Sequence, residues 1–225
     1  MKVFQDGQND IGIHGRNEYR RTLYSFFKYC KMQDWLDINP VGKVESWRIR
    51  GKAPEIFTPE EVQKILNSTP PQSEIRAYAA IAAFTGIRNA EMKRLPWDKI
   101  KLDNREIILD SEITKTASRR VVKIPENLAK WLEPYVWELG TKKKILTKSQ
   151  NLQIKKLHNA LGKGNWVKNG FRHSAATYYL ALTKNAYLTA EQMGHAVDVL
   201  KQHYNGLARE KDAIRYFNIM PDMPE

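Results

Sequence analysis

The chain has 225 residues, enough for one sizeable core and a small extra unit, and its hydrophobic fraction of 42% is typical of a soluble globular protein. Its 37 Lys and Arg residues outnumber 25 Asp and Glu, and the net charge of +12 favours nucleic acid as a partner, ahead of an anionic membrane surface. There is no apolar run of roughly 18 residues, no signal-peptide pattern, no zinc-like cluster and only one cysteine, Cys30. We therefore expect a cytoplasmic protein without a membrane span, disulfide, metal ion or small-molecule cofactor.

The N-terminal quarter is predicted to hold one amphipathic helix. Residues 1–15 are polar, contain three glycines and lack periodicity, which predicts a flexible tail. Apolar residues recur at helical intervals over 16–36, and we expect Pro40 and Gly42 to end this helix. The segment 41–55 mixes basic residues with Gly and Pro, which predicts an extended linker along a phosphate backbone. Its expected DNA contacts are Arg48, Arg50 and Lys52.

Helices followed by a small sheet are predicted next. Thr58-Pro59-Glu60-Glu61 is a helix start with a capping threonine and a proline at the first position, and a second helix should cover 74–85. Short β-like runs between turn signals then predict an antiparallel sheet, with strands at 100–102, 106–109, 112–114 and 120–124. After Pro125 the pattern is helical, with helices expected at 126–138, 148–161, 170–182, 189–193, 197–204 and 209–217. This order predicts an α+β fold that is mostly helical.

Two of the later helices carry further signals. Thr189 and Gln192 have the spacing of a capping box, which predicts that the short helix starts at Thr189. In the last helix, Ala213, Ile214 and Phe217 form an apolar stripe. This stripe can fold back on the chain's own core or pass to another subunit.

Arg88 is the first candidate site residue. It follows a Thr85-Gly86 break and precedes Glu91 by three residues, a spacing at which the carboxylate can orient the guanidinium. An arginine held in this way can bind two phosphate oxygens. The alternative is a surface ion pair that contributes little to stability.

Lys115 lies at the end of a strand-like run, before a turn of Thr116, Ala117 and Ser118. The returning run begins with two arginines, Arg119 and Arg120, and such a basic hairpin could enter a DNA groove. Alternatively, Lys115 is a solvated lysine on an edge hairpin, where lysines are common.

The remaining candidates lie near the C-terminus. Asn169 precedes Arg172 by three residues, so in a helix the two side chains would share a face and could address one phosphate. Asn169 could equally be an ordinary helix N-cap. His195 follows Met193-Gly194 and precedes Tyr204 by nine residues. A histidine after glycine is usually a loop residue, and nine other tyrosines occur, so only the spacing distinguishes Tyr204.

In their order and spacing, the motifs around Arg88, Lys115, Arg172, His195 and Tyr204 resemble the active site of the tyrosine recombinases, the phage integrase family. The resemblance implies an integrase-like catalytic domain over residues 56–225. It also implies that 16–55 is a remnant of the core-binding domain, its last helix and the basic linker. The implied activity is site-specific DNA recombination and integration for a mobile element, on double-stranded DNA and with other copies of the chain. A tetrameric synapse with exchanged C-terminal helices belongs to this expectation.

The resemblance also implies roles for individual residues. Tyr204 would be the nucleophile that forms a 3′-phosphotyrosyl intermediate, and Lys115 would be the general acid that protonates the leaving 5′ oxygen. Cations and hydrogen-bond donors around the phosphate would replace a metal ion by stabilising charge on its nonbridging oxygens. This group comprises Arg88, Arg172, His195 and, as a neutral donor, Asn169, and the supporting residues are Glu91, His173 and His203.

Two features depart from the family pattern. Asn169 occupies a position that is usually histidine, and an amide cannot act as a general base. Tyr204 must then be activated by water, by the phosphate or by cations that lower the phenol pKa.

The second departure is that the chain has room for only the end of a core-binding domain. These departures leave open an alternative class, a noncatalytic or decayed integrase-like DNA-binding protein. A metal-dependent nuclease lacks a suitable acid cluster, and a type IB topoisomerase would relax DNA without sequence choice.

Overall fold

The computed structural model describes residues 11–48, 53–114, 119–146, 157, 161–162 and 166–222. The chain divides into two compact units, residues 1–52 and 53–225, and each is described by itself. The predicted linker residues Arg50 and Lys52, the predicted acid Lys115 and most of the helix expected at 148–161 lie outside the described residues.

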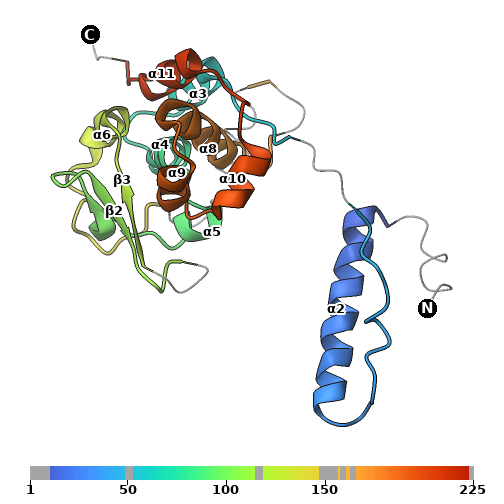
Figure 1. Ribbon diagram of the computed structural model, residues 1–225. Coiled ribbons are helices and arrows are strands. Elements are labelled where there is room, and N and C mark those ends of the chain that lie inside the picture. Colours follow the sequence, from blue (N-terminus) through green and yellow to red (C-terminus); the bar gives the residue numbers. More distant parts are fainter. Residues whose placement is uncertain are drawn as a thin grey trace. The chain divides into compact units, whose positions relative to one another are not determined.

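The first unit contains the helix α2 (Ile13–Met32) and the segment that follows it (Figure 1). The helix begins three residues before the expected start, with Gly12 as its N-cap. It ends at Met32 with Gln33 as its C-cap, and Asp34 adopts a left-handed backbone with φ of 56°, so the expectation that Pro40 and Gly42 end the helix was wrong. Asparagine and aspartate tolerate this conformation better than most residues, and one such residue is enough to reverse the chain.

The segment after α2 runs back along the helix, with no free extended linker up to Arg48. The Asn17 side chain makes two hydrogen bonds of 2.9 Å with the main chain of Trp47, one in each direction. Arg20 donates to the carbonyl of Val44, and Val41 is fully buried. Arg48 is exposed. The part of the predicted linker that the structure describes here is therefore fastened to the helix by side-chain contacts, which a reading of Gly and Pro content cannot detect.

In the second unit, the long helices surround α4 (Glu74–Thr85), nearly all of whose residues are buried (Figure 1). The predicted bounds of this helix are correct. The predicted start of α3 (Pro59–Asn67) is also confirmed, because the Thr58 hydroxyl accepts from the Glu61 amide and the Glu61 carboxylate accepts from the Thr58 amide. Both helices carry their start signals within a few residues, so local sequence specifies them.

Within the described residues, the antiparallel sheet has three strands in the order β1 (Ile100–Lys101), β2 (Glu106–Leu109) and β3 (Arg120–Lys123). Its register pairs Ile107 with Val122. The fourth strand, expected at 112–114, is a turn instead, because the amides of Ile113 and Thr114 both donate to the Asp110 carbonyl. Short β-branched runs fit a strand or a buried turn equally well.

Helices complete the unit around the sheet and the core (Figure 1). They are α5 (Asn89–Met92), η1 (Trp97–Lys99), α6 (Glu126–Leu132), η2 (Glu133–Tyr135), α8 (Gly170–Thr183), α9 (Ala186–Met193), α10 (Val197–His203) and α11 (Glu210–Phe217). The helix expected at 126–138 changes to η2 where Pro134 has no amide to donate. The capping-box prediction at Thr189 was wrong: Asn185 caps α9 by accepting from the amides of Tyr187 and Leu188.

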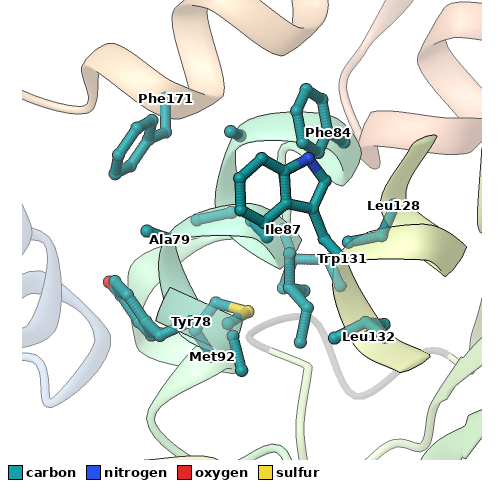
Figure 2. Close-up of a cluster of buried hydrophobic side chains, with 14 of the residues drawn as sticks. Tyr78, Ala79, Phe84, Ile87, Met92, Leu128, Trp131, Leu132 and Phe171 are labelled. Atoms are coloured by element: carbon teal, nitrogen blue, oxygen red, sulfur yellow. The ribbon is translucent and has the colours of Figure 1, made fainter. Parts of the chain in front are cut away.

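The core lies between α4, α6 and α8. Figure 2 shows Trp131 of α6 beside Phe84 and Ile87, with Phe171 of α8 nearby. The Trp131 indole N–H donates to the Ile219 carbonyl at 3.0 Å, which fastens the end of the described chain to α6. This packing fixes α8, whose first turn carries Arg172, and α4, whose C-terminal end leads into the turn that carries Arg88.

Helix α11 packs against α8 and α3 of its own chain. Tyr216 is fully buried, stacks on Tyr178 with ring centroids 4.3 Å apart, and donates to the Ala83 carbonyl at 2.7 Å. The predicted apolar stripe was partly wrong, because Ile214 is 46% exposed and Tyr216 takes the buried position. A tyrosine with a satisfied hydroxyl can serve as a core residue.

Two searches of the described residues complete the fold. None of their helices combines the length and the apolar character that crossing a lipid bilayer requires. Among the same residues, no group of three or more His, Cys, Asp or Glu side chains is arranged to hold a metal ion.

Candidate active site

Four segments that are far apart in the sequence meet at one place in the second unit. They are the turn between α4 and α5, the start of α8, the turn after α9 and the end of α10. Their side chains Arg88, Arg172, His195 and Tyr204 are linked through the contacts described below. The structure thus brings together four of the six predicted catalytic residues.

Arg88 is held by a buried carboxylate and a main-chain carbonyl. Its Nη1 donates to Glu91 Oε1 at 3.0 Å, and its Nη2 donates to the Gly194 carbonyl. Glu91 is fully buried, which removes the alternative of a surface ion pair. Burial alone would raise the pKa of Glu91, but hydrogen bonds and charge from Arg120 and Arg88 lower the pKa below its ordinary value.

Arg120, predicted as a DNA contact, is the second arginine on Glu91. Its two terminal nitrogens donate to the two carboxylate oxygens at 3.0 and 2.7 Å, and its side chain is only 14% exposed. Its neighbour Arg119 is 67% exposed, and its Nε lies 3.8 Å from Asp110 Oδ1 in an ion pair at the surface. Because Arg120 begins β3, the pair with Glu91 fixes the returning arm of the hairpin next to Arg88.

Arg172, in the first turn of α8, is held by three acceptors. Its guanidinium donates to the carbonyls of Gly86 and, at 2.9 Å, Met193, and its Nε donates to His195 Nε2 at 3.1 Å. Burial, together with the nearby charge of Arg88, lowers the pKa of Arg172 to about 9, so the side chain stays protonated at pH 7. A guanidinium has five N–H donors, and these three bonds leave two of them for a ligand.

His195 is neutral and its tautomer is set by Arg172. Burial, with the charges of Arg172 and Arg88, lowers the pKa of His195 to about 3. Because Nε2 accepts from Arg172, Nδ1 carries the proton, and this buried N–H has no hydrogen-bond partner among the described residues. The imidazole also stacks on the Tyr204 ring, with centroids 5.7 Å apart. His195 therefore supplies an unused hydrogen-bond donor beside the phenol.

Tyr204 ends α10 and is only 4% exposed. Its hydroxyl lies 2.8 Å from Nδ1 of His173, the residue after Arg172. Burial raises the pKa of Tyr204, and Arg172 only partly opposes this effect. In this structure nearby cations therefore do not lower the phenol pKa below its ordinary value, contrary to one of the three activation routes considered from the sequence.

Asn169 lies directly before α8 with a left-handed backbone, φ 57° and ψ 22°. It occupies the N-cap position, but its side chain makes no capping hydrogen bond, and the residue is exposed. It lines a small cavity of about 90 Å³ together with Tyr78, Asn89 and Arg172. Asn169 is outside the helix, so the prediction that it shares a helical face with Arg172 was wrong. The two residues instead line the same cavity.

The other predicted site residues are not joined to this cluster by described hydrogen bonds. His203 is half-buried beside Tyr204, and its charge contributes to lowering the pKa of His173. Arg48 belongs to the first unit.

Sequence reasoning missed the groups that hold the cations in place. Gly86 and Gly194 both have a left-handed backbone, with φ of 63°, and their carbonyls accept from Arg172 and Arg88. Gln192 makes two bonds of 2.9 Å with the main chain of Lys123, which fasten α9 to β3. The two turns could have been predicted, because a glycine directly follows each predicted helix. The carbonyls that accept from the arginines could not, because every residue has a carbonyl and the sequence does not show which one is used.

Comparisons with known proteins agree with this geometry. The Phage integrase family model matches residues 55–211, more than half of the chain. A tyrosine recombinase of Thermosipho africanus (strain TCF52B) is 25% identical over 195 residues, which cover 80% of this chain and 66% of that protein. Tyrosine recombinase XerD of Listeria innocua serovar 6a (strain ATCC BAA-680 / CLIP 11262) is 24% identical over 225 residues, which cover 89% and 74%. The chain thus spans slightly less than two thirds of the first relative.

A solved structure of a lambda integrase(75-356) dimer bound to a COC' core site superposes with a TM-score of 0.69 and 17% identity. The match covers 93% of this chain and 80% of that one. At this identity the likeness concerns the fold alone. It confirms the predicted α+β class, mostly helical with a small antiparallel sheet.

Proposed function

Because the chain belongs to the phage integrase family, we propose that it is a site-specific DNA recombinase that cleaves and rejoins strands through a 3′-phosphotyrosyl intermediate. The observation that carries the proposal is the convergence of Arg88, Arg172 and His195 on the buried Tyr204. Three groups that donate hydrogen bonds to anions, placed beside one nucleophilic hydroxyl, fit attack on a phosphodiester.

In the proposed reaction, the Tyr204 oxygen attacks the phosphorus and the bond to the 5′ oxygen breaks. Arg88 and Arg172 use their remaining N–H groups, and His195 its Nδ1–H, to bind the nonbridging oxygens as they gain charge. Lys115 gives a proton to the leaving oxygen. A 5′ hydroxyl of another strand then attacks the phosphotyrosine and releases Tyr204, so joining needs no ATP.

Asn169 has a supporting part in this proposal. From its place beside Arg172 at the small cavity, its amide can donate one more hydrogen bond to the phosphate, but it cannot accept the phenol proton. The noncatalytic alternative is not favoured, because Arg172, His173 and His195 remain assembled around Tyr204 although Asn169 stands where the family usually has histidine.

The partner is double-stranded DNA, which the net charge of +12 supports by favouring phosphate contacts. Exposed Arg119 beside the site, with Arg48, Arg50 and Lys52 before the second unit, would contact the backbone. The matched lambda integrase is a dimer on a DNA core site, and we extend to this chain an assembly of several copies on DNA, with a tetrameric synapse as the recombining form. Exchange of α11 between copies requires Tyr216 to leave its buried position.

The test is an SDS-resistant protein–DNA adduct on nicked suicide duplexes from the ends of the element that encodes the chain. The wild type should form the adduct, and Tyr204→Phe should abolish it without weakening DNA binding. Asn169→His, which restores the usual residue, should retain it, since histidine also tolerates a left-handed backbone. A wild type that binds DNA but forms no adduct would instead support the noncatalytic alternative.

A further inference from the structure

The Tyr204 hydroxyl has a specific partner outside the residues that were predicted to be catalytic. His173 Nδ1 lies 2.8 Å from this oxygen, within the range of a direct hydrogen bond, and the two rings lie 5.8 Å apart at 33°. Meanwhile the usual histidine position holds Asn169, which is exposed and cannot titrate. From the residues described, the titratable side chain in contact with the reacting oxygen is therefore His173.

We infer that His173 is the general base of this chain and accepts the Tyr204 proton during strand cleavage, a role that rests on the recombinase function proposed above. The proton moves from the phenol oxygen to His173 Nδ1 as that oxygen forms its bond to phosphorus. The bond from phosphorus to the 5′ oxygen breaks, and that oxygen takes a proton from the general acid. In the rejoining step the same proton returns from Nδ1 to Tyr204 as it leaves.

The protonation states suit this transfer. Burial, with the charges of Arg172 and His203, lowers the pKa of His173 below 6.5, so the ring is neutral at pH 7 and Nδ1 can accept. Burial raises the pKa of Tyr204, which makes spontaneous ionisation at neutral pH rare and a base necessary. The bond also requires that the His173 proton sit on Nε2. The charged and titratable groups facing His173 are Arg172 beside it, Tyr204 and His203 of the α10 end, and His195 of the turn after α9.

The position of His173 also fits. It lies in the first turn of α8, next to Arg172, and its amide donates to the Asn169 carbonyl at 2.9 Å. Base and phosphate ligand are thus adjacent residues on one rigid helix. A base must lie within hydrogen-bond reach of the proton that it removes, and His173 already meets that condition without DNA.

The closing experiment measures single-turnover cleavage of a suicide duplex by the full chain. His173→Asn keeps a hydrogen-bond acceptor near Nδ1 but cannot take up a proton, so a purely structural role would survive this change. We expect cleavage to slow by about 100-fold or more, the usual contribution of a general base, with DNA binding unchanged. His14→Asn, an exposed histidine of α2, is the matched control and should cleave like the wild type.

Two further readouts separate proton transfer from positioning. The wild-type rate should fall as the pH drops through the lowered His173 pKa, below 6.5, whereas His173→Asn should become about tenfold faster for each unit of rising pH as the phenol ionises. Added imidazole should partly restore cleavage by His173→Ala. A 5′-bridging phosphorothiolate substrate, whose leaving group needs no acid, should rescue Lys115→Ala but not His173→Asn.

The outcomes distinguish the two proposals. A wild type that forms no adduct overturns the recombinase function and this inference together. A wild-type adduct with an unchanged rate in His173→Asn overturns the inference alone. If the variants fail to fold, the wild-type profile decides, because a rate that stays constant from pH 7 down to the pH at which the protein unfolds is incompatible with a histidine base.

Discussion

At the scale of single residues, the candidate site is organised around Glu91. This fully buried carboxylate accepts from Arg88 and from both terminal nitrogens of Arg120. Without it, two guanidinium groups would face each other with little water to screen them. Glu91 therefore fixes the positions of both Arg88 and Arg120 in the candidate site.

Replacing Glu91 with glutamine keeps the side-chain shape and removes the charge. We expect Glu91→Gln to lower the free energy of unfolding at pH 7 by about 3 kcal/mol, the cost of leaving buried charges without their partner. Because the folded-state pKa of Glu91 is lowered, its contribution is complete above 4.5 and is lost as the pH falls through the folded value. Urea unfolding at pH 7 and pH 3 measures both effects, and the loss should shrink at pH 3.

The control for this variant is Glu112→Gln at an exposed acid, which should change stability little. An equally stable Glu91→Gln protein at pH 7 would show that the arginines find other partners.

Gly194 is the second residue at which a small change should have a large effect. Its φ is 63°, and a Cβ atom there would lie 3.0 Å from the Arg120 guanidinium. We expect Gly194→Ala to cost about 1 to 2 kcal/mol of stability from backbone strain, and in addition to shift Arg120 and slow cleavage. Gly140→Ala is matched in strain, with φ of 84°, but nothing lies within 4 Å of its Cβ. Equal effects of both substitutions, measured by thermal unfolding, would argue that the contact with Arg120 is unimportant.

At the scale of elements, the site depends on how α9 is joined to β3. The Gln192 amide accepts from the Lys123 N–H and donates to the Lys123 carbonyl, so it pairs with the strand as another strand would. The two residues after Gln192 lead into the turn that presents His195, and β3 carries Arg120. One side chain therefore sets the distance between the hairpin and the histidine turn.

Replacing Gln192 with leucine removes both hydrogen bonds and leaves the main-chain groups of Lys123 unpaired. We expect Gln192→Leu to lower the free energy of unfolding by about 2 kcal/mol. The more specific readout is hydrogen exchange at the Lys123 amide, which should become faster while α3 is unaffected. Gln63→Leu, at a bond to Met220 near the surface, is the comparison and should leave Lys123 protected. Unchanged exchange at Lys123 would mean that another acceptor protects that amide.

At the scale of the whole molecule, charge is the property that distinguishes this chain. The charges that make up the net +12 differ in burial, since Arg120 and Arg88 share the buried Glu91 whereas Arg119 is 67% exposed and its ion pair with Asp110 lies at the surface. Binding to DNA releases counterions in proportion to the phosphates contacted, so each exposed cation that meets a phosphate can be counted from the salt dependence.

Arg119→Gln tests this count. We expect weaker binding to any duplex and a reduction of about 1 in the slope of log K against log salt concentration, the signature of one lost phosphate contact. Lys130→Gln on α6 is the control: like Arg119 it is an exposed cation in a surface ion pair, here with Glu133, but it makes no described contact with the residues of the candidate site. If both variants keep the wild-type slope in titrations at several salt concentrations, Arg119 at the start of β3 does not contact a DNA phosphate.

Prediction from the sequence succeeded where the signal was local or periodic. The start of α3, the whole of α4 and the central strand β2 have the predicted bounds because capping residues and turn signals define them. Candidate residues were found through their chemistry and spacing, as with Arg172 and His195. The sequence could not show that Asn185 would compete successfully with Thr189 as a cap, since both patterns fit.

Contacts between residues far apart in the sequence could not be predicted either. The bond between His173 and Tyr204 spans 31 residues, and that between Arg172 and Gly86 spans 86. Such contacts depend on how helices pack, and packing is decided by the whole core. His173 was accordingly assigned a supporting role from sequence, although it is the group that touches the phenol oxygen.

The arginines of the site rest largely on main-chain carbonyls, those of Gly86, Met193 and Gly194. Every amino acid supplies a carbonyl, so these contacts survive any substitution that preserves the path of the backbone. Many substitutions around the site should therefore leave the arginines in position, provided that the turns at Gly86 and Gly194 and the carboxylate of Glu91 remain.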